Sequence, residues 1–296
     1  MPEVMARRDT FVIGHPIAHS RSPMIHGYWL AQHGLTADCA YRAIDVAPEQ
    51  LAGFFRDLVS GETGFVGGNV TIPHKQAAFA LADRPDAIAS ALGAANTIWI
   101  ENGKICASNT DGYGFLANLD AMAPGWDHAR KHAVVLGAGG AARAIIHALT
   151  LRGFAHVGVF NRSHQRAADI AAAYPTVVKA FELSALEEAL VNANLFVNTT
   201  SLGMTGKTAL DIDIAGLPAD CVVADIVYVP LETDLLARAR KRGLRTADGL
   251  GMLLHQAVPG FERWYGKRPE VTAELRALVV DDITAGINAV QKQAAP

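Results

Sequence analysis

Polar clusters in the first third of the chain carry hydroxyl, amide, ammonium and carboxyl groups at spacings that suit a small-molecule site. The clusters read G-H-P-I-A-H-S-R-S-P (14–23), G-N-V-T-I-P-H-K (68–75), G-A-A-N-T (93–97) and N-T-D-G (109–112). Ser22 also suits the N-cap of a helix whose first position is Pro23. Ser20 has no such capping role, so two hydroxyls this close together predict a site for a small anion.

Taken alone, each of the remaining polar groups in these clusters has a simpler, purely structural explanation. Lys75 ends the second cluster, but a lone lysine is more often a solvated surface group than a catalyst. The Asn-, Asp- and Gly-containing clusters are typical of turns, because these residues bond to their own backbone or tolerate left-handed conformations. Their chemistry therefore depends on the elements that position them.

A glycine-rich turn in the middle of the chain predicts a dinucleotide site. An apolar strand at 133–136 runs directly into G-A-G-G-A-A (137–142), and a helical stretch follows. In this setting the first glycine makes a tight turn, the second lets a pyrophosphate approach the backbone, and the helix N-terminus favours the phosphates. The alternative is an ordinary strand–helix turn rich in small residues. The residues expected at the phosphates are Gly137, Ala138, Gly139, Gly140 and Ala141.

The residues after the next strand indicate which dinucleotide is bound. A strand expected at 155–160 is followed by Asn161, Arg162 and Ser163, with no acid to hold a ribose 2′-hydroxyl. Arg162 and Arg166, one helical turn apart, would instead grip a 2′-phosphate through charge-assisted hydrogen bonds. The alternative is a solvated helix start. We therefore expect NADP in preference to NAD.

Length and composition fit a compact enzyme. The 296 residues are 50% hydrophobic and 19% charged, and the formal net charge of −3 gives no electrostatic reason to expect nucleic acid or an anionic membrane. The three cysteines are widely spaced, and no H-E-x-x-H pattern occurs, so neither a disulfide frame nor a metal site is expected. No stretch approaches the roughly 18 uninterrupted apolar residues of a membrane span, and no signal peptide is evident. A soluble, cytoplasmic protein is expected.

Strands and helices alternate along the chain, which predicts an α/β architecture. Strands are expected at 10–14, 41–46, 64–71, 195–198 and 222–225, and a hairpin is expected to turn at Asn102-Gly103. A helix at 114–122 breaks at Pro124-Gly125, just before the nucleotide strand, which marks a boundary region. From residue 252 onward the pattern is mostly helical.

The chain resembles the shikimate dehydrogenase family nearly from end to end. The four clusters carry the resemblance in the first half, and five motifs carry it in the second half, in the family's order. These motifs are G-A-G-G-A-A-R-A (137–144), N-R-S (161–163), N-T-T-S-L-G-M (198–204), D-I-V-Y (225–228) and D-G-L-G-M-L-L-H-Q-A (248–257). The resemblance implies a substrate-binding α/β domain over 1–115, completed by 252–296, and a Rossmann-type NADP-binding domain over 116–251. The active site would lie in the cleft between these domains.

The same resemblance implies NADP-linked interconversion of 3-dehydroshikimate and shikimate, in aromatic amino-acid biosynthesis. Ser20 and Ser22 would bind the substrate carboxylate, and Lys75 and Asp111 match the family's catalytic pair. The residues expected around the ring hydroxyls are Thr71, Asn96, Tyr228 and Gln256. Further residues expected at the cofactor are Thr199, Ile226, Gly249 and Met252.

The chemistry of the reaction supports a lysine at the reacting oxygen. Hydride reduction of a ketone leaves negative charge on oxygen, and that charge must be stabilised and protonated. An ammonium group does both, as a charge and as a proton donor.

Two alternatives remain open from the sequence. A relative specialised for quinate, or one that uses both substrates, would keep the same fold; Ser22 and Arg162 favour shikimate with NADP. A catalytically idle NADP-binding sensor would tend to lose the lysine or the aspartate, and both are present. The partners expected are small molecules, and the sequence leaves monomer and homodimer equally open.

Overall fold

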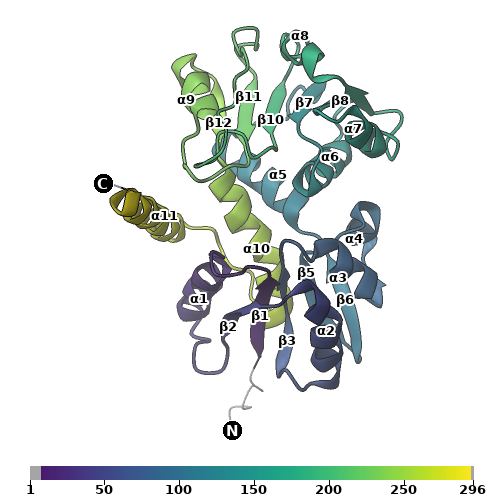
Figure 1. The fold of residues 1–296 in the computed structure, drawn as a ribbon, viewed down its shortest axis with the longest axis vertical. Coiled ribbons are helices and arrows are strands. Elements are labelled where there is room, and N and C mark those ends of the chain that lie inside the picture. Colours follow the sequence, from purple (N-terminus) through teal and green to yellow (C-terminus); the bar gives the residue numbers. More distant parts are fainter. Residues whose placement is uncertain (1–7, 295–296) are drawn as a thin grey trace. The chain divides into compact units, whose positions relative to one another are not determined.

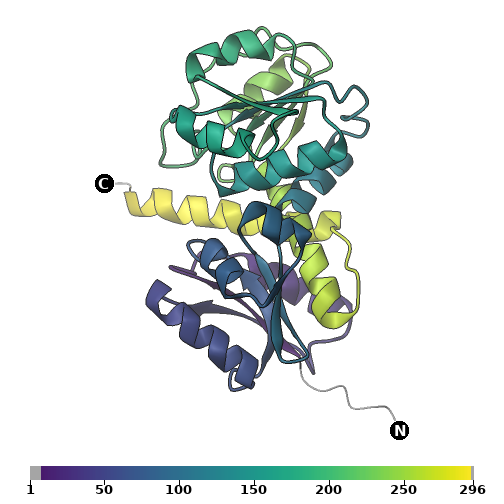
Figure 2. The ribbon, with the colours of Figure 1, turned by 90° about the vertical axis from the view of Figure 1, so that its right-hand side faces the viewer.

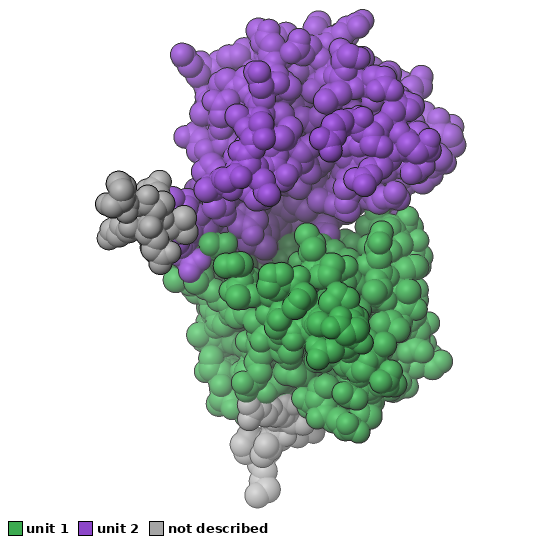
Figure 3. Space-filling model, in the orientation of Figure 1, with its two compact units in different colours: residues 1–110, 256–281 green, residues 111–255, 282–296 purple. Residues whose placement is uncertain are grey.

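The computed structural model describes residues 8–294, with side chains described over residues 8–287. The chain forms two compact units, which are coloured separately in Figure 3. Unit 1 comprises Met1–Thr110 and Gln256–Asp281, and unit 2 comprises Asp111–His255 and Asp282–Pro296.

These unit boundaries differ from the expected division at 115/116 and 251/252. Helix α5 (Asp111–Met122) lies wholly in unit 2. A Cβ at Gly112 would lie 2.8 Å from the carbonyl oxygen of Ala144, so α5 packs closely on the helix that carries Ala144 from its first turn onward. The expected boundary at 115/116 would cut through this packed helix.

Unit 1 is built on a mixed six-stranded sheet (Figure 1). The strands are β1 (Asp9–Gly14), β2 (Tyr41–Asp45), β3 (Phe65–Val70), β4 (Arg84–Pro85), β5 (Thr97–Glu101) and β6 (Lys104–Ser108), in the order β2-β1-β3-β5-β6-β4. Strand β1 is parallel to β2 and β3, whereas β5 is antiparallel to both β3 and β6. The β5–β6 hairpin turns at Asn102 and Gly103, both at positive φ, as the Asn-Gly pair predicted.

Helices α2 (Leu51–Ser60), α3 (Lys75–Leu81) and α4 (Ala87–Leu92) pack on the sheet of unit 1 and share an apolar core with it that includes Phe11, Ile13, Phe55 and Ile98. The unit also contains α1 (Ser22–Gln32), η1 (Pro48–Gln50) and parts of α10 (Gly249–Tyr265) and α11 (Ala273–Ala294). The rings of Trp29 in α1 and Phe261 in α10 are in contact, with centroids 5.5 Å apart.

The start of α1 corrects one sequence prediction. Ser22 is the first helical residue, and Arg21 is the N-cap without a side-chain capping bond, so the prediction of Ser22 as N-cap was wrong. The Ser20 hydroxyl oxygen, which was expected to have no capping role, accepts the N–H of Ser22, the first helical residue, at 3.4 Å. The Ser22 hydroxyl does not cap the helix.

Unit 2 contains a six-stranded sheet in which every neighbouring pair is parallel. The strands are β7 (His132–Leu136), β8 (His156–Phe160), β9 (Val178–Phe181), β10 (Leu195–Asn198), β11 (Val222–Asp225) and β12 (Arg245–Ala247), in the order β12-β11-β10-β7-β8-β9. Numbered from the first strand of this unit, that is the 3-2-1-4-5-6 order of the doubly wound Rossmann fold. The α/β prediction is therefore confirmed.

Helices lie on both faces of the parallel sheet (Figure 2). They are α5, α6 (Gly140–Arg152), α7 (His164–Ala171), η2 (Leu183–Ala185), α8 (Leu186–Leu190) and α9 (Asp234–Lys241). Because both faces are covered, the central strands are apolar runs without alternation, as in A-V-V-L and L-F-V.

A buried imidazole in unit 1 makes the stability of the fold depend on pH. His26 of α1 is fully buried and stacks on Tyr41, with ring centroids 4.0 Å apart. Burial lowers the pKa of His26 to about 3. The unfolded chain takes up this proton below a pH of about 6.5, whereas the folded chain does not, so folding stability is retained above that pH and lost as the pH falls towards 3.

We expect His26→Phe to flatten the acid side of the stability profile. Each pH unit below about 6 should cost the wild type about 1.4 kcal/mol of unfolding free energy through this one group. Urea unfolding at pH 7, 6 and 5 measures the slope for both proteins, and their difference isolates His26 from the other histidines. Equal slopes would show that His26 takes up a proton in the folded state.

Candidate active site

The substrate residues predicted in unit 1 gather at one edge of its sheet. Strands β1, β3 and β6 all end at this edge, and the antiparallel β5 begins there. The carboxyl ends of parallel strands meet at one edge of a sheet, so the loops that follow them lie side by side. The predicted residues on these segments are Ser20 and Ser22 after β1, Thr71 and Lys75 after β3, and Asn96 before β5.

The loops after β1 and β3 are bonded to each other. The N–H of Thr71 donates to the carbonyl of Ile13 at 2.9 Å, and that of His15 donates to the carbonyl of Ile72 at 3.2 Å. A Cβ at Gly14 would lie 2.6 Å from the Thr71 side chain, so only glycine allows this approach. The Ser20 and Thr71 loops are therefore held together by the backbone.

Asn96 lies at the centre of a buried polar network. Its side-chain oxygen accepts the N–H of Thr110 and the hydroxyl of Thr97, each at 2.9 Å. Its Nδ2 donates to the Thr110 hydroxyl at 3.0 Å and to the side-chain oxygen of Gln256 at 3.4 Å. The Thr110 hydroxyl donates to the Gln256 carbonyl at 2.7 Å. These bonds fix which way the Asn96 amide points and bring the predicted residues Asn96 and Gln256 together.

Lys75 is positioned by bonds on both sides of it. It is the first residue of α3 and is half-buried, and its carbonyl accepts the N–H of Ala95 at 2.8 Å. The preceding His74 is buried, and its Nε2 lies 2.6 Å from the carbonyl oxygen of Val46. Asp111 is buried and begins α5, directly after the loop that follows β6. Lys75 thus belongs to unit 1, and Asp111 is the first residue of unit 2.

The glycine turn of unit 2 lies at the switch point of its sheet, between β7 and β10. Gly137 has a φ of 110°, and its N–H donates to the carbonyl of Phe160 at 2.7 Å. The Thr199 hydroxyl, at the end of β10, donates to the carbonyl of Leu136 at 2.7 Å, and a Cβ at Gly137 would collide with Thr199. The fold itself therefore requires glycine at position 137.

Gly139 and Gly140 differ from Gly137, because the fold does not require glycine at these two positions. Gly139 caps α6 with a φ of −89°, a value open to any residue. Apart from the neighbouring residues and the backbone of the helix itself, no described atom lies within 4 Å of an ideal Cβ at either position. This open space, next to the free N–H groups of a helix N-terminus, fits a pyrophosphate. Ala138 and Ala141 are half-buried beside it, and Ala142, in the third glycine's place, is fully buried in the core.

We expect Gly139→Ala to weaken NADPH binding without loss of stability. The new methyl group would enter space that the phosphates need, and such overpacking costs about 1–3 kcal/mol, which is roughly a 5- to 150-fold rise in Kd. Fluorescence titration with NADPH and urea unfolding measure the two effects. Gly27→Ala is the matched control, since its Cβ also meets no described atom but lies in unit 1. Unchanged NADPH affinity in Gly139→Ala would contradict the assignment.

Residues after β8 have the exposure that a 2′-phosphate site needs. Asn161 is fixed by a bond from its Nδ2 to the Ser163 carbonyl at 2.9 Å. Arg162 and Arg166 are exposed, so their guanidinium groups can reach a ligand. Since Gly137 bonds to Phe160, the last residue of β8, this segment lies beside the glycine turn.

The remaining predicted cofactor residues surround a second part of the same sheet edge. Thr199, Ile226 and Tyr228 line a hollow of about 330 Å³, together with neighbours from the loops after β10 and β11. Gly249 packs against the backbone of the β11 loop, where its N–H donates to the Val227 carbonyl at 3.3 Å. Met252 is half-buried against the core of unit 2.

Gly251 allows close packing between two helices. In the structure the space beside its α-carbon is filled by the Asn118 carboxamide, whose Nδ2 donates to the Asp248 carbonyl at 2.7 Å. Gly251 therefore serves the packing of α10 on α5.

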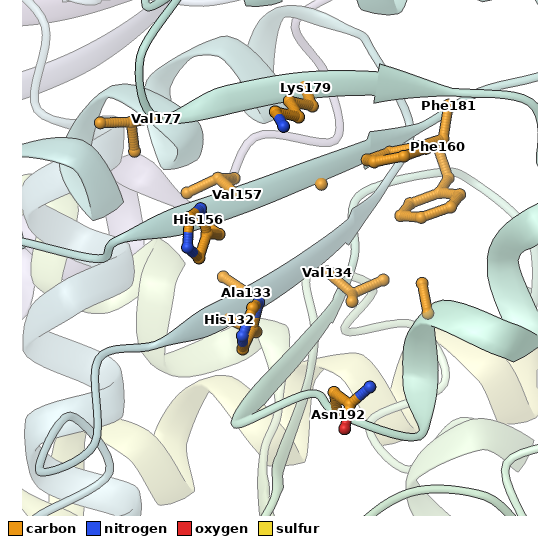
Figure 4. A pocket seen from close by; sticks show the side chains of 12 residues that line it. His132, Ala133, Val134, His156, Val157, Phe160, Val177, Lys179, Phe181 and Asn192 are labelled. Carbon is orange, nitrogen blue, oxygen red and sulfur yellow. The ribbon is translucent and has the colours of Figure 1, made fainter.

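A larger groove of about 340 Å³ lies elsewhere on unit 2 (Figure 4). It lies on the face of the sheet formed by β7, β8 and β9, with the stacked rings of His132 and His156 and the paired rings of Phe160 and Phe181 among its walls. None of the predicted site residues lines it. The candidate site is thus the carboxyl edge of the strands and not this groove.

Over residues 8–294, which the structure describes, no helix combines the length and apolarity that crossing a membrane requires. Within the same residues, His, Cys, Asp and Glu side chains nowhere gather in groups of three or more that could hold a metal ion.

Some residues of the site were not singled out from the sequence. Asn69 accepts the Tyr41 hydroxyl at 2.7 Å and donates to the Asn96 carbonyl at 3.0 Å, and Thr110 joins Asn96 to Gln256. Both residues lie inside the polar clusters. One signal could have identified them: each is a polar residue in a strand, or at the end of a strand, where the fold buries the side chain.

The fold and these two sets of residues define a class of protein, the two-unit nicotinamide-dependent dehydrogenases. Three family models match the chain: the shikimate dehydrogenase substrate binding domain over residues 12–98, shikimate / quinate 5-dehydrogenase over 120–205, and the shikimate 5′-dehydrogenase C-terminal domain over 249–278. A shikimate dehydrogenase (NADP(+)) from Rhizobium meliloti is 56% identical over 92% of this chain and 94% of its own length. The chain belongs to the shikimate dehydrogenase family.

Solved structures agree with this assignment. The quinate dehydrogenase of Corynebacterium glutamicum in complex with NAD has a TM-score of 0.84 and 30% identity, covering 93% of this chain and 99% of its own. The shikimate 5-dehydrogenase of Thermus thermophilus in complex with NADP(H) and shikimate has a TM-score of 0.78 and 33% identity, with the same two coverages.

Proposed function

We propose that this protein catalyses the reversible, NADP-dependent reduction of 3-dehydroshikimate to shikimate, a step in aromatic amino-acid biosynthesis. The observation that carries the proposal is that the two units present different chemical groups, one set suited to the substrate and the other to the cofactor. Unit 1 gathers hydroxyl, amide and ammonium groups at one sheet edge, and unit 2 offers a glycine turn with open space at Gly139 and exposed arginines after β8. The high identity to NADP-dependent relatives supports it.

Unit 1 would bind the substrate through neutral donors and amides. The hydroxyls of Ser20 and Ser22 would donate to the carboxylate, as their place at the start of α1 allows. Thr71, Asn96 and Gln256 would bind the ring hydroxyls, and Tyr228 is a further residue proposed to contact the substrate. The buried network around Asn96 pre-orients its amide, which avoids an ordering cost when the substrate binds.

Lys75 and Asp111 would handle the proton. Bound NADPH supplies the hydride that goes to the ketone carbon. The Lys75 ammonium stabilises the charge that develops on the ketone oxygen and gives that oxygen its proton. The Asp111 carboxylate would bind a ring hydroxyl and balance the lysine charge. In the reverse direction Lys75 takes the proton from the alcohol.

The cofactor residues fit NADP at both of its ends. The first N–H groups of α6 and the open space at Gly139 and Gly140 would hold the pyrophosphate. Arg162 and Arg166 would bind the 2′-phosphate, with Asn161 and Ser163 shaping the loop. Thr199, Ile226, Gly249 and Met252 would surround the nicotinamide end.

We place this reaction in the cytoplasm, with small molecules as the partners. The cysteines at 39, 106 and 221 are free and buried, and burial raises the pKa of the Cys221 thiol to about 12, which keeps it protonated. Buried protonated thiols are inert structural groups, as expected for a protein of a reducing compartment. The protein would act as a monomer or a homodimer.

Product analysis tests the proposed function. Purified protein with shikimate and NADP⁺ should form NADPH, seen at the reduced-nicotinamide absorbance band, in equal amount to a ketone product two hydrogens lighter than shikimate. The reverse reaction should consume both products. Absence of NADPH formation, with NADPH still bound by the protein, would favour the idle sensor over the enzyme.

A further inference from the structure

Two loops of unit 2 are joined by a pair of buried side chains outside the set assigned to ligands. Asn198 is the last residue of β10, and Asp225 is the last residue of the neighbouring β11, where the two pair in register. Asn198 is 0% exposed and Asp225 is 2% exposed. The loops that follow them, 199–204 and 226–229, supply all the residues that line the 330 Å³ hollow with Thr199, Ile226 and Tyr228.

Asp225 organises the β11 loop at both of its ends. One carboxylate oxygen accepts the N–H of Val227 at 3.0 Å, which bends the chain directly after the strand. The other accepts the hydroxyl of Thr233 at 2.7 Å, where the loop enters α9. Burial raises the pKa of Asp225, and these donors act in the opposite direction by favouring its charged form.

Asn198 organises the β10 loop in the same way and links it to Asp225. Its side-chain oxygen accepts the N–H of Thr200 at 3.1 Å and the Thr200 hydroxyl at 2.8 Å. Its Nδ2 donates to the Leu202 carbonyl at 3.3 Å and to Asp225 at 3.0 Å. One amide therefore fixes the turn of its own loop and contacts the acid that fixes the next one.

We propose that Asn198 and Asp225 are positioning residues for the reaction, which hold the two loops in the shape that receives the nicotinamide and presents Tyr228. This inference rests on the proposed function. Neither side chain is exposed, so each would act through the loop backbone and not by touching the substrate. Since a misplacement of about 1 Å at reacting groups can cost about a hundredfold in rate, loosening these loops should reduce turnover more than cofactor affinity.

Substitutions of one side chain at a time in this network test the proposal. Thr233→Val keeps the approximate shape of the side chain and removes the hydroxyl that Asp225 accepts. That hydroxyl also caps α9 by accepting the N–H of Leu236 at 3.4 Å, and Thr233→Ser restores both bonds. Asn198→Ala frees the β10 loop and leaves Asp225 with its Val227 and Thr233 donors. Asp213→Asn is the matched control, because Asp213 accepts the N–H of Ala215 in the same i to i+2 pattern on an exposed turn outside the hollow.

Three readouts separate positioning from general weakening of the unit. For Asn198→Ala and Thr233→Val we expect kcat to fall about tenfold or more, an effect of misplacement, with Thr233→Ser and Asp213→Asn close to the wild type. Affinity for adenosine 2′,5′-bisphosphate, which lacks the nicotinamide, should stay unchanged. Amide hydrogen exchange over 199–204 and 226–229 should become faster in the two impaired variants.

Each other outcome overturns the proposal. Unchanged kcat in both variants, unchanged exchange in both loops, or a loss of adenosine 2′,5′-bisphosphate affinity that matches the loss of kcat would contradict positioning. The exchange measurement does not depend on turnover. A wild type without activity would therefore refute the proposed function while the exchange data still report on the Asn198–Asp225 pair.

Discussion

Lys75→Ala is expected to lower kcat for shikimate oxidation by about a hundredfold or more, because positioned proton transfer contributes about 10²–10⁴-fold to a rate. NADPH affinity should stay close to that of the wild type, since Lys75 lies in unit 1 and the glycine turn lies in unit 2. Stopped-flow turnover and a fluorescence titration with NADPH measure the two quantities.

The controls for Lys75 distinguish proton transfer from simple charge. Lys75→Arg keeps the positive charge but should not rescue turnover, because a guanidinium is effectively never deprotonated. Lys104→Ala removes an exposed lysine of β6 in the same unit and should leave kcat unchanged. A Lys75→Ala variant that keeps more than about a tenth of wild-type turnover would refute the catalytic role.

Removal of Arg162 and Arg166 is expected to abolish the preference for NADP over NAD. Hydrogen bonds to charged groups contribute about 1.5–3 kcal/mol each, so the double alanine variant should bind NADPH about a hundredfold more weakly or worse. NADH affinity should hardly change, because NADH lacks the 2′-phosphate. Isothermal titration with both cofactors measures this difference.

A second cation in the same unit serves as the control for the arginines. Lys179→Ala removes an exposed positive charge from β9, in the groove away from the glycine turn, and should leave both affinities unchanged. An equal loss of NADPH and NADH affinity in the arginine variant would mean that these side chains bind something other than the 2′-phosphate.

In unit 2 the sequence predicted the central strands of the sheet but not the strands at its two edges. The strands at 195–198 and 222–225 were expected with the bounds that the structure shows, because parallel strands covered on both faces are continuous apolar runs. Strands β9 and β12 were not expected. They are the two edge strands of the unit 2 sheet, with only four and three residues, and half-exposed V-K-A-F and R-T-A carry little periodicity.

The start of α5 shows how tertiary packing overrides a local signal. Asp111-Gly112 is typical of a turn, so the helix was expected to begin at 114, yet it begins at Asp111. Gly112 is needed inside the helix because it lies against the Ala144 carbonyl. A contact between residues this far apart in sequence cannot be inferred from local propensity.

The candidate site was predictable as a set of residues but not as a network. Motif order placed Ser20, Thr71 and Asn96 in loops, and the sheet topology brings those loops to one edge. Which amide faces which hydroxyl depends on side-chain packing that no single stretch of sequence contains. For that reason the bridging roles of Asn69 and Thr110 emerged only from the structure.

The most direct test of the proposed function is a comparison of kcat/KM for four pairs: shikimate or quinate, each with NADP⁺ or NAD⁺. We predict that shikimate with NADP⁺ exceeds shikimate with NAD⁺ by about tenfold or more, since Arg162 and Arg166 favour the 2′-phosphate by at least one charge-assisted hydrogen bond. Shikimate with NADP⁺ should also exceed quinate with NADP⁺, the preference that Ser22 indicates. A higher value for quinate or for NAD⁺ would contradict the specificity. Failure to reduce either cofactor with either substrate would contradict the assignment as an enzyme.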